Sequence, residues 1–489
     1  MTEQRILVLD AGTTSTRAMV FARDGTLTAV ASRAITQHYP QPGHVEHDAG
    51  EIWETTLACA RAVTDKVGGA SAIAAIGITN QRETVVAWDR TTGKPLGPAL
   101  VWQDRRTAEV CAQLRNQGHE PVVQARTGLL LDPYFSASKM RWLIDHVAAV
   151  GEAAQDGRLA LGTVESWLVW QLTGGARHVS DAGNASRTSL LALDGLDWDA
   201  DLLALFGVPR AALPHVVDSA GHFGTTKLLG AAVPICGLAG DQQAATIGQG
   251  CLAPGQTKAT YGTGAFVLAN MGQAIPRSGH RLLGTVLYQL NGERSYALEG
   301  SVFVAGSLVQ WLRDALGLFA SAAETAALAA SVPDSGGVVI VPALAGLGAP
   351  HWRPEARGAI SGLSFATTRA HIARAALEAM AQQTSDLARA FAADGVAWNT
   401  LRIDGGMSAN NWMAQDLADV LAIPVERPRF VETTALGAAM LAGLGAGLFA
   451  SLKEAAATMR GAVECFEPKM DEAVRQERLE RWRKALARV

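Results

Sequence analysis

Short apolar runs separated by turn residues open the chain. Residues 5–9 (RILVL) have the length of a buried strand and end at Asp10, after which Gly-Thr-Thr-Ser forms a turn. Residues 18–21 and 27–31 are further strand candidates on either side of an Asp-Gly turn signal. The pattern predicts a strand, a tight turn and two returning strands, and not a strand followed by a glycine loop and a helix.

Helical and strand patterns alternate along the rest of the chain, which is typical of α/β proteins. The predicted helices cover residues 51–66, 137–149 and 371–391, and the predicted strands cover residues 73–79, 336–344 and 401–406, the last ending in a glycine turn. Asn410 comes next, and its side-chain oxygen is expected to cap the helix that follows.

A second copy of the opening pattern lies in the second half of the chain. Residues 258–270 (KATYGTGAFVLAN) repeat the plan of residues 7–21 (LVLDAGTTSTRAMVF): a short strand, a Gly/Thr turn and a short apolar strand. A duplicated domain would place the two turns face to face across a cleft, and chance similarity between two hairpins is the alternative. A boundary near residue 250 divides the chain into two domains, residues 1–250 and 251–489.

Composition predicts a folded protein that does not bind nucleic acid. The 489 residues carry a formal net charge of −4, and 48% are hydrophobic and 18% charged, which argues against intrinsic disorder. No dense run of Lys or Arg occurs, so a nucleic-acid partner is not expected. The five cysteines lie far apart and form no CxxC pair, a pattern typical of reduced thiols in the cytoplasm and not of disulfides or a zinc site.

One uncharged stretch, residues 435–452, raises the question of a membrane span. It contains GxxxG spacing, but it consists mostly of weakly apolar Ala and Gly, and four glycines interrupt it. A closely packed buried helix followed by a loop is the favoured interpretation, so no membrane span is expected. The N-terminal residues also lack the basic region and apolar core of a signal peptide.

The first constellation with chemical meaning is LDAGTTSTR, residues 9–17. Its turn would expose backbone N–H groups that can donate to phosphate oxygens. The hydroxyls of Thr13, Thr14 and Ser15 could donate to the same oxygens, and the guanidinium of Arg17 would add positive charge. Asp10 could hold Mg²⁺ through water, because Mg²⁺ gives up its hydration reluctantly. The alternative is an ordinary hairpin turn. Neither a P-loop nor a Rossmann glycine motif occurs here.

The second constellation is GLAGDQQAA, residues 237–245, in which small residues lead a strand to Asp241. A carboxylate at such a point suits a positioned general base. The alternative is that Asp241 caps the N-terminus of the following helix, and this segment alone does not separate the two roles.

The third constellation is ITNQRET, in which a buried strand delivers Arg82 and Glu83 side by side. Charges at a buried strand end are costly unless they are paired or bind a ligand, and together they offer the donors and acceptors that a polyhydroxylated ligand needs. The alternative is a surface ion pair, the commoner fate of neighbouring charges. Trp102 and Tyr134 could complete such a pocket, although aromatic residues more often belong to a core.

Taken together, these segments resemble the FGGY family of carbohydrate kinases. Thirteen similar segments occur in the family's order and span nearly the whole chain: LDAGTTSTR, PGHVEHD, GITNQRET, VWQDRRTA, TGLLLDPYFSASK, NASRTSL, GDQQAA, YGTGAF, YALEGSVFVAG, GLGAPHW, ARGAISGL, DGGMSANN and TALGAA. The resemblance implies an α/β fold with two actin-like ATPase (ribonuclease H-like) domains and a cleft between them. It also implies an ATP- and Mg²⁺-dependent enzyme of glycerol catabolism that makes sn-glycerol 3-phosphate.

The resemblance assigns roles to single residues. Positions matching the site of the ATP phosphates are Thr13, Thr14, Ser15 and Arg17. Positions matching the glycerol pocket are Arg82, Glu83, Trp102, Tyr134, Asp241, Gln242 and Phe266. Positions matching the rest of the nucleotide site are Thr263, Gly306, Gln310, Gly406 and Asn410. Asp241 would be the catalytic base and Asp10 the Mg²⁺ residue, and a homo-oligomer, either a dimer or a tetramer, is expected.

Two alternatives to glycerol phosphorylation stay open at this point. Many glycerol-phosphorylating members of the family have Cys where this chain has Asp104, and Trp-x-Asp-x-Arg is a pattern of the family's sugar kinases. Asp104 therefore leaves a tetritol or a ketopentose as a possible substrate. An actin-like chaperone or filament subunit is the alternative from another class, but it leaves Arg82, Glu83 and Tyr134 without a role.

Overall fold

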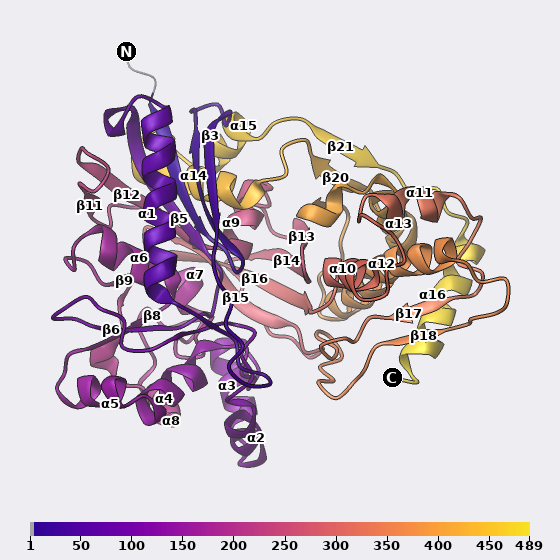
Figure 1. Cartoon of the computed structure of the whole chain (residues 1–489), viewed down its shortest axis with the longest axis horizontal. Coiled ribbons are helices and arrows are strands. Elements are labelled where there is room, and N and C mark those ends of the chain that lie inside the picture. Colours follow the sequence, from indigo (N-terminus) through magenta and orange to yellow (C-terminus); the bar gives the residue numbers. More distant parts are fainter. Residues whose placement is uncertain (1–3) are drawn as a thin grey trace.

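The computed structural model describes residues 4–489, which fold around two large β-sheets that lie side by side (Figure 1). The first sheet has the strand order β11-β12-β5-β1-β2-β3, and the second has the order β15-β16-β14-β13-β19-β20-β21. In Figure 1 the indigo and magenta strands of the first sheet lie to the left of the pink and orange strands of the second. The structure thus confirms the expected α/β architecture.

The first sheet begins with the predicted meander. Strands β1 (Arg5–Ala11), β2 (Ser15–Phe21) and β3 (Leu27–Ala34) are antiparallel neighbours. Strand β5 (Ile73–Asn80) pairs in parallel with β1, and β12 (Val233–Gly240) pairs in parallel with β5. All six residues of β1 after Arg5 are buried, which explains its unbroken apolar pattern.

The second sheet repeats this plan. Strands β13 (Thr257–Tyr261), β14 (Ala265–Gly272) and β16 (Glu293–Val302) are antiparallel, and β19 (Leu401–Asp404) and β20 (Val425–Pro428) follow in parallel with β13. A duplicated domain predicts two units with the same strand plan. Chance similarity between two hairpins would not extend to the strands around them. The domain boundary near residue 250 stays a prediction.

The remaining strands extend the sheets or form small two-stranded sheets. They are β4 (Glu46–His47), β6 (Val86–Asp89), β7 (Ala99–Leu100), β8 (Leu159–Gly162), β9 (Val179–Asp181), β10 (His215–Val217), β11 (Thr225–Thr226), β15 (Leu283–Leu290), β17 (Val339–Val341), β18 (Ala359–Ser361) and β21 (Val463–Phe466). The strand predicted over residues 336–344 is thus the much shorter β17, which pairs with β18.

Helices pack against the two large sheets, against the small sheets and against one another. They are α1 (Ala49–Lys66), α2 (Ala108–Asn116), α3 (Glu120–Thr127), α4 (Ser136–His146), α5 (Ala148–Gln155), α6 (Val164–Leu172), α7 (Ala182–Ala185), α8 (Ala200–Phe206), α9 (Asp241–Gly248), α10 (Gly306–Asp314), α11 (Glu324–Ala330), α12 (Arg369–Ala393), α13 (Asn411–Leu421), α14 (Thr433–Gly445), α15 (Leu452–Met459) and α16 (Glu472–Leu486). Asn410 caps α13 as predicted, because its side chain accepts a hydrogen bond from the Met413 N–H at 3.1 Å.

The prediction of one continuous helix over residues 137–149 is wrong. The segment forms two helices, α4 and α5, which are separated at Val147. Val147 has extended backbone angles, with φ −110° and ψ 104°, and serves both as the C-cap of α4 and as the N-cap of α5. Apolar spacing continues through this break, so periodicity alone does not reveal it.

The uncharged stretch near residue 440 forms helix α14, which packs on the first sheet although it follows strand β20 of the second. It contacts α9, β12, β5 and β1, and Figure 1 shows it in orange beside the indigo strands. Its residues from Ala435 to Gly443 are all buried. No helix within residues 4–489 is long and apolar enough to cross a membrane.

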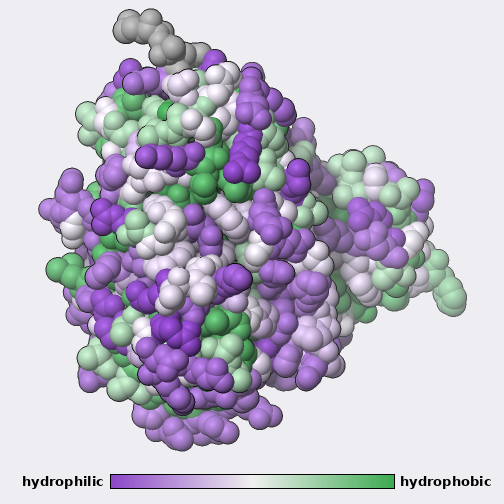
Figure 2. Space-filling view, turned by 60° about the vertical axis from the view of Figure 1, so that its left-hand side comes forward, coloured by the Kyte–Doolittle hydropathy of each residue, from purple (hydrophilic) through white to green (hydrophobic). Residues whose placement is uncertain are grey.

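The outer surface gives no sign of a large apolar interface on the face of the first domain that Figure 2 presents. Hydrophilic and intermediate residues cover most of that face, and apolar residues appear in scattered groups. Such scattered groups are normal on a folded protein.

Candidate active site

A cavity of about 480 Å³ lies between the two sheets, and we call it the central cavity. Both Gly/Thr turns line it, one from the β1–β2 hairpin and one from the β13–β14 hairpin. Its lining residues are Asp10, Gly12, Thr13, Thr14, Ser15, Arg17, Arg82, Glu83, Trp102, Tyr134, Asp241, Gln242, Thr260, Gly262, Thr263, Gly264, Phe266, Gly406 and Thr434. The two turns thus face one another across a cleft, as the internal repeat predicts.

The first turn, between β1 and β2, is tight and contacts the aromatic ring of Trp102. The Gly12 N–H donates to the Ser15 carbonyl at 3.0 Å, which closes the turn. The Thr13 hydroxyl accepts a hydrogen bond from the Trp102 indole N–H at 3.0 Å. The conformation of this turn and the position of the Trp102 ring therefore depend on one another.

A carboxylate–guanidinium–carboxylate chain lies beside the first turn. Arg17 donates to Asp10 from Nη2 at 2.5 Å and to Glu432 from Nη1 at 2.6 Å. Burial raises the pKa of Asp10, and the Arg17 charge opposes that rise. Glu432 precedes α14, so Arg17 also connects the first turn to the segment that returns from the second sheet.

The second turn closes in the same way, with the Gly262 N–H donating to the Gly264 carbonyl at 2.9 Å. The Gly306 N–H donates to the Gly262 carbonyl at 2.9 Å, so α10 begins directly behind the turn. A Cβ atom on Gly264 would lie 2.5 Å from the Val302 carbonyl oxygen, so no side chain fits at this position.

Arg82 follows β5 and is held by contacts from three directions. Its Nη1 and Nη2 atoms donate to the Glu299 carboxylate at 2.6 and 3.1 Å, and Nη2 also donates to the Tyr134 hydroxyl at 3.2 Å. The Nε atom lies 3.4 Å from Oδ1 of Asp241. Arg82 is 3% exposed, so its guanidinium is fixed by protein contacts and has little access to bulk water.

Glu83 has a left-handed backbone, with φ 62°, which few residues other than glycine adopt. Its side chain is buried and accepts a hydrogen bond from Arg187 Nε at 2.6 Å. Burial raises the pKa of Glu83, and Arg82 and Arg187 lower it in part. Backbone strain of this kind is concentrated at functional sites, where the surrounding structure maintains it.

Three aromatic rings stand together beside these charges. Trp102 packs edge-on against Tyr134 and against Phe266, with ring centroids 5.8 and 6.2 Å apart. Tyr134 is 4% exposed, and the Trp102 and Phe266 rings are partly exposed to the cavity. The site thus offers an apolar wall next to Arg82 and Glu83.

Asp241 is the first residue of α9, and its side chain points into the central cavity. The N-cap of this helix is Gly240, so Asp241 is not the capping residue. Burial raises the pKa of Asp241, while Arg82, Lys258 and the Gln242 N–H lower it. The helix N-terminus also favours a negative charge at this position.

Sequence patterns missed the partners that hold these residues in place. Glu299 and Arg187 lie on β16 and after α7, both are fully buried, and Arg187 Nη2 donates to Glu299 at 3.0 Å. Lys258 on β13 donates to the Thr260 hydroxyl at 2.8 Å and to the Gln242 side chain, and burial lowers its pKa to about 8. Glu299 and Lys258 each lie within a strand of largely apolar residues, and a charge in such a place was the sequence signal that could have identified them.

Not every predicted residue lines the central cavity. Gly306 lies behind the second turn, Gln310 is exposed on α10, and Asn410 caps α13 beyond Gly406. Asp104 is fully buried and does not line the cavity: its Oδ2 atom accepts from the Val45 N–H at 2.6 Å and from Arg106 Nη2 at 2.7 Å.

Two family models cover most of the chain. The model of the N-terminal domain of the FGGY family of carbohydrate kinases matches residues 5–248, and the model of the C-terminal domain matches residues 257–446. The chain belongs to the FGGY family of carbohydrate kinases. The resemblance seen in the sequence motifs is therefore confirmed, together with the expectation of two actin-like ATPase domains.

Relatives match along the full length. A glycerol kinase of Aromatoleum aromaticum is 56% identical over 488 residues, covering 99% of this chain and 98% of the relative, and one of Alcanivorax borkumensis is 55% identical with the same coverage. The crystal structure of Plasmodium falciparum glycerol kinase with ADP is 35% identical, with a TM-score of 0.91 over 99% of this chain and 98% of that chain. A xylulose kinase from Lactobacillus acidophilus shares the fold, with a TM-score of 0.88 at 23% identity.

Proposed function

We propose that this protein transfers the γ-phosphoryl group of ATP to a terminal hydroxyl of glycerol and releases sn-glycerol 3-phosphate and ADP. The observation that carries this proposal is the position of Asp241 beside Arg82, in a cavity with a Gly/Thr turn on either side. Relatives named glycerol kinases, more than half identical along nearly the whole chain, support the same substrate.

The polyol pocket that we propose matches the chemistry of glycerol. Arg82, Glu83, Asp241 and Gln242 offer donors and acceptors for three hydroxyl groups. Trp102 and Phe266 offer apolar surface for the carbon backbone, and the Tyr134 hydroxyl accepts a hydrogen bond from Arg82. A site built on buried hydrogen-bonding groups discriminates strongly against ligands that lack the matching hydroxyls.

Asp241 acts as the general base in this proposal. Its carboxylate accepts the proton of the attacking hydroxyl while the oxygen forms a bond to the γ-phosphorus and the bond from that phosphorus to the β–γ bridging oxygen breaks. A raised pKa brings a carboxyl group closer to the range in which proton transfer is efficient. Arg82, 3.4 Å away, keeps the carboxylate oriented and available in its charged form.

The two Gly/Thr turns are the proposed cradle for the ATP phosphates. Backbone N–H groups and the hydroxyls of Thr13, Thr14, Ser15 and Thr263 can donate to phosphate oxygens, and Arg17 adds positive charge. We place the rest of the nucleotide along the segments that carry Gly306, Gln310, Gly406 and Asn410. Excluding water from this cavity matters, because water is a competing acceptor of the phosphoryl group.

We further propose that Mg²⁺ binds with the nucleotide near Asp10. Asp10 and Asp241 both face the central cavity, and the pKa of Asp241 is raised by burial first and also by the negative charge of Asp10. Two oxygen-donor side chains of like charge suit a hard cation that keeps part of its hydration shell. When bound, Mg²⁺ would neutralise charge on the phosphates, and Asp10 would hold one of its water ligands.

The hypothesis that the substrate is a tetritol or a ketopentose loses its main support. Asp104, the residue that favours a tetritol or a ketopentose, is buried against Val45 and Arg106 and does not line the central cavity. The chaperone or filament alternative also gives no reason for the buried charges around Arg82.

We also propose a cytoplasmic location and assembly into a dimer or a tetramer. The five cysteines are free thiols, four of them buried, which supports a reducing compartment. Assembly rests on the family resemblance, and light scattering on the purified protein tests it.

A substrate screen tests the proposed function. ADP release is measured with ATP and Mg²⁺ in the presence of glycerol, erythritol, dihydroxyacetone or ketopentoses, and with water alone. We expect the highest kcat/KM with glycerol and no activity when Mg²⁺ is chelated. Glycerol-dependent release no faster than the rate in water would refute the substrate, and a preference for a ketopentose would favour the alternative.

A further inference from the structure

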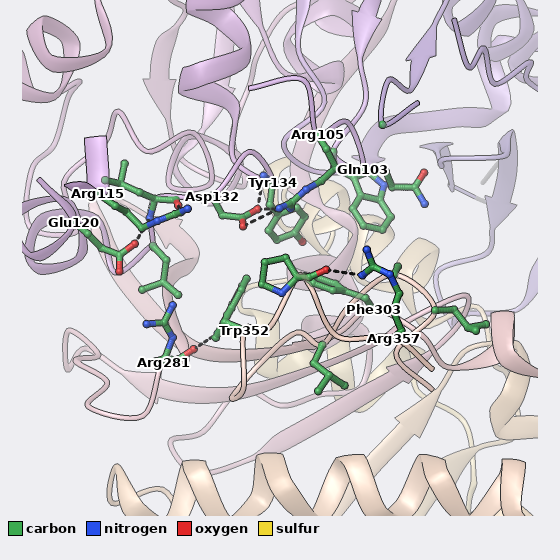
Figure 3. A pocket seen from close by; sticks show the side chains of 18 residues that line it. Gln103, Arg105, Arg115, Glu120, Asp132, Tyr134, Arg281, Phe303, Trp352 and Arg357 are labelled. Atoms are coloured by element: carbon green, nitrogen blue, oxygen red, sulfur yellow. Dashed lines mark hydrogen bonds and ion pairs between the residues drawn. The ribbon is translucent and has the colours of Figure 1, made fainter. Parts of the chain in front are cut away.

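A second and larger cavity, of about 880 Å³, lies next to the central cavity, and we call it the arginine-lined cavity. Trp102 and Tyr134 line both cavities, so the two spaces meet at the proposed polyol pocket. Figure 3 shows residues of the first domain, such as Arg105 and Asp132, opposite Trp352 and Arg357 of the second. Nothing in the proposed reaction so far gives this cavity a role.

Positive charge dominates the lining of the arginine-lined cavity. Four guanidinium groups, those of Arg105, Arg115, Arg281 and Arg357, stand against the carboxylates of Glu120 and Asp132. Both carboxylates already have partners. Asp132 accepts from Arg105 Nη1 at 2.8 Å and from the Tyr134 N–H at 2.9 Å, and Glu120 accepts from the Leu131 N–H at 3.1 Å. The excess charge is therefore available to an anion.

Arg281 is the most available of the four. Its side chain is exposed and has no hydrogen bond or ion pair to any residue of the described chain, 4–489. Arg115 donates to the Leu131 carbonyl, and Arg357 donates through Nη1 to three backbone carbonyls of its own loop, at 2.9–3.1 Å. Arg357 keeps its other N–H groups free for a ligand.

The backbone at the cavity is strained at two linked positions. Arg281 has φ 61° and Trp352 has φ 48°, both in the left-handed region that side chains other than glycine rarely adopt. The Trp352 indole N–H donates to the Arg281 carbonyl at 2.8 Å, and this ring packs against Phe303 with centroids 6.0 Å apart. Strain that is maintained by such contacts indicates a functional position and not an irregular surface loop.

We propose that the arginine-lined cavity is the exit route of the phosphorylated product and that its arginines bind the phosphate dianion during release. This inference rests on the proposed function. A nucleotide with its phosphates between the two Gly/Thr turns occupies the central cavity, and the polyol beyond it then faces the shared wall of Trp102 and Tyr134. Glycerol is neutral and its phosphate ester is a dianion, so the arginines favour the product over the substrate.

The test uses the difference in charge between substrate and product. Arg281→Gly removes the guanidinium and suits the backbone, because glycine adopts a φ of 61° without strain. The KM for sn-glycerol 3-phosphate is measured in the reverse reaction with ADP, and the KM for glycerol in the forward reaction. We expect the first to rise about two- to fivefold and the second to change less than twofold, since exposed charge pairs contribute modestly.

Three further variants make the test specific. Arg281→Lys keeps the charge and should restore most of the affinity for sn-glycerol 3-phosphate. The double variant Arg281→Gly with Arg357→Gln should raise that KM further, and added salt should reduce the difference from the wild type. Arg483→Gln removes an exposed charge on α16, outside the cavity, and should change neither constant.

The outcomes separate this inference from the proposed function. A wild-type enzyme without glycerol-dependent activity would refute the proposed function itself. An active wild type whose affinity for sn-glycerol 3-phosphate is unchanged in the double variant would overturn the exit route alone. Equal increases in both KM values would also overturn it, because the cavity would then not distinguish an anion from a neutral polyol.

Discussion

At the scale of single residues, the site depends on four buried charges that neutralise one another. Arg82 and Arg187 donate to Glu299, and Arg187 also donates to Glu83. Burial alone raises the pKa of Glu299, but Arg187 and Arg82 reverse this effect and hold it at about 2. Breaking a buried ion pair is costly because the remaining charge stays uncompensated. Glu299 is therefore the residue that holds Arg82 in place in the proposed polyol pocket.

Glu299→Gln tests this positioning role. The amide keeps the shape but places an N–H₂ group against one of the two guanidinium N–H groups of Arg82, so one charged hydrogen bond is lost. We expect the KM for glycerol to rise about 10- to 100-fold, from a loss of about 1.5–3 kcal/mol, while the KM for ATP changes less than threefold. Steady-state kinetics with each substrate varied in turn measures both constants.

A matched control separates positioning from general stability. Glu378 is also a buried carboxylate, paired with Arg374 at 3.0 Å on α12, away from the central cavity. Glu378→Gln should lower the melting temperature without raising the KM for glycerol. If Glu299→Gln behaves in the same way as this control, Glu299 is structural and does not position Arg82.

The sequence indicated which charged residues are buried where a local signal existed, while the roles assigned to them stay predictions. Arg82 and Glu83 stand out as adjacent charges at the end of an apolar strand, and the structure buries both beside Asp241. Glu299 lies 217 positions away from Arg82 in the chain, and no local pattern indicates that the two side chains meet. Pairing across the two sheets is a tertiary property, so only the folded structure reveals it.

At the scale of elements, the contact between α9 and α14 requires glycine. A Cβ atom on Gly437 of α14 would lie 1.8 Å from the Ala244 carbonyl oxygen, and one on Gly248 of α9 would lie 1.9 Å from the Thr433 carbonyl oxygen. These distances concern backbone atoms, which cannot rotate away as side chains do. Because α9 begins with Asp241, the packing of the two helices fixes the position of the carboxylate that we propose as the general base.

Gly437→Ala should therefore destabilise the protein and lower its activity. Overpacking of a buried contact costs about 1–3 kcal/mol or more, which outweighs the higher helix propensity of alanine. Differential scanning fluorimetry measures the melting temperature, and turnover is measured below it. Gly461→Ala is the control, because a Cβ there meets no atom within 4 Å. A Gly437→Ala variant as stable as this control would contradict the packing argument.

Elements whose signals are local were predicted well from the sequence. Both hairpins were found because their turns and flanking apolar runs lie within fifteen residues, and Asn410 was identified as a helix cap from its position after a glycine turn. The return of α14 to the first sheet was not predicted, since an apolar pattern shows that a helix is buried but not against what. The break between α4 and α5 was missed for a similar reason.

At the scale of the whole molecule, a buried acidic pair makes stability depend on pH. Glu165 is fully buried, accepts from the Thr163 and Ser180 hydroxyls at 2.6 Å, and lies near Asp181. Burial, together with the charge of Asp181, raises its pKa to about 7. The folded state thus binds a proton more tightly than the unfolded state, so this group's contribution to stability falls as pH rises from about 4.5 to 7.

Glu165→Gln removes this titration while keeping the size of the side chain. Relative to the wild type, the variant should gain about 1–3 kcal/mol between pH 5 and pH 8, or roughly 1–3 °C in melting temperature for a chain of this length. Melting temperatures of both proteins across this range measure the difference. A constant offset at every pH would show that Glu165 has an ordinary pKa in the folded protein.

The proposed active site lies between the two large sheets of the molecule. Each domain supplies one Gly/Thr turn, and neither turn forms a complete site by itself. The duplication visible in the sequence predicted this arrangement, but not the second cavity, because segments from residue 43 to residue 357 enclose it. Spaces between domains depend on packing that a linear pattern does not record.

The most direct test of the central claim is Asp241→Asn, with turnover, glycerol affinity and melting temperature measured on one preparation. The amide keeps the shape and one acceptor oxygen but cannot take the proton of the attacking hydroxyl. We predict that turnover falls about 100- to 10,000-fold, while glycerol affinity changes modestly and the melting temperature stays within a few degrees of the wild type. Near-normal turnover in a folded variant that binds glycerol would contradict the assignment of Asp241 as the catalytic base.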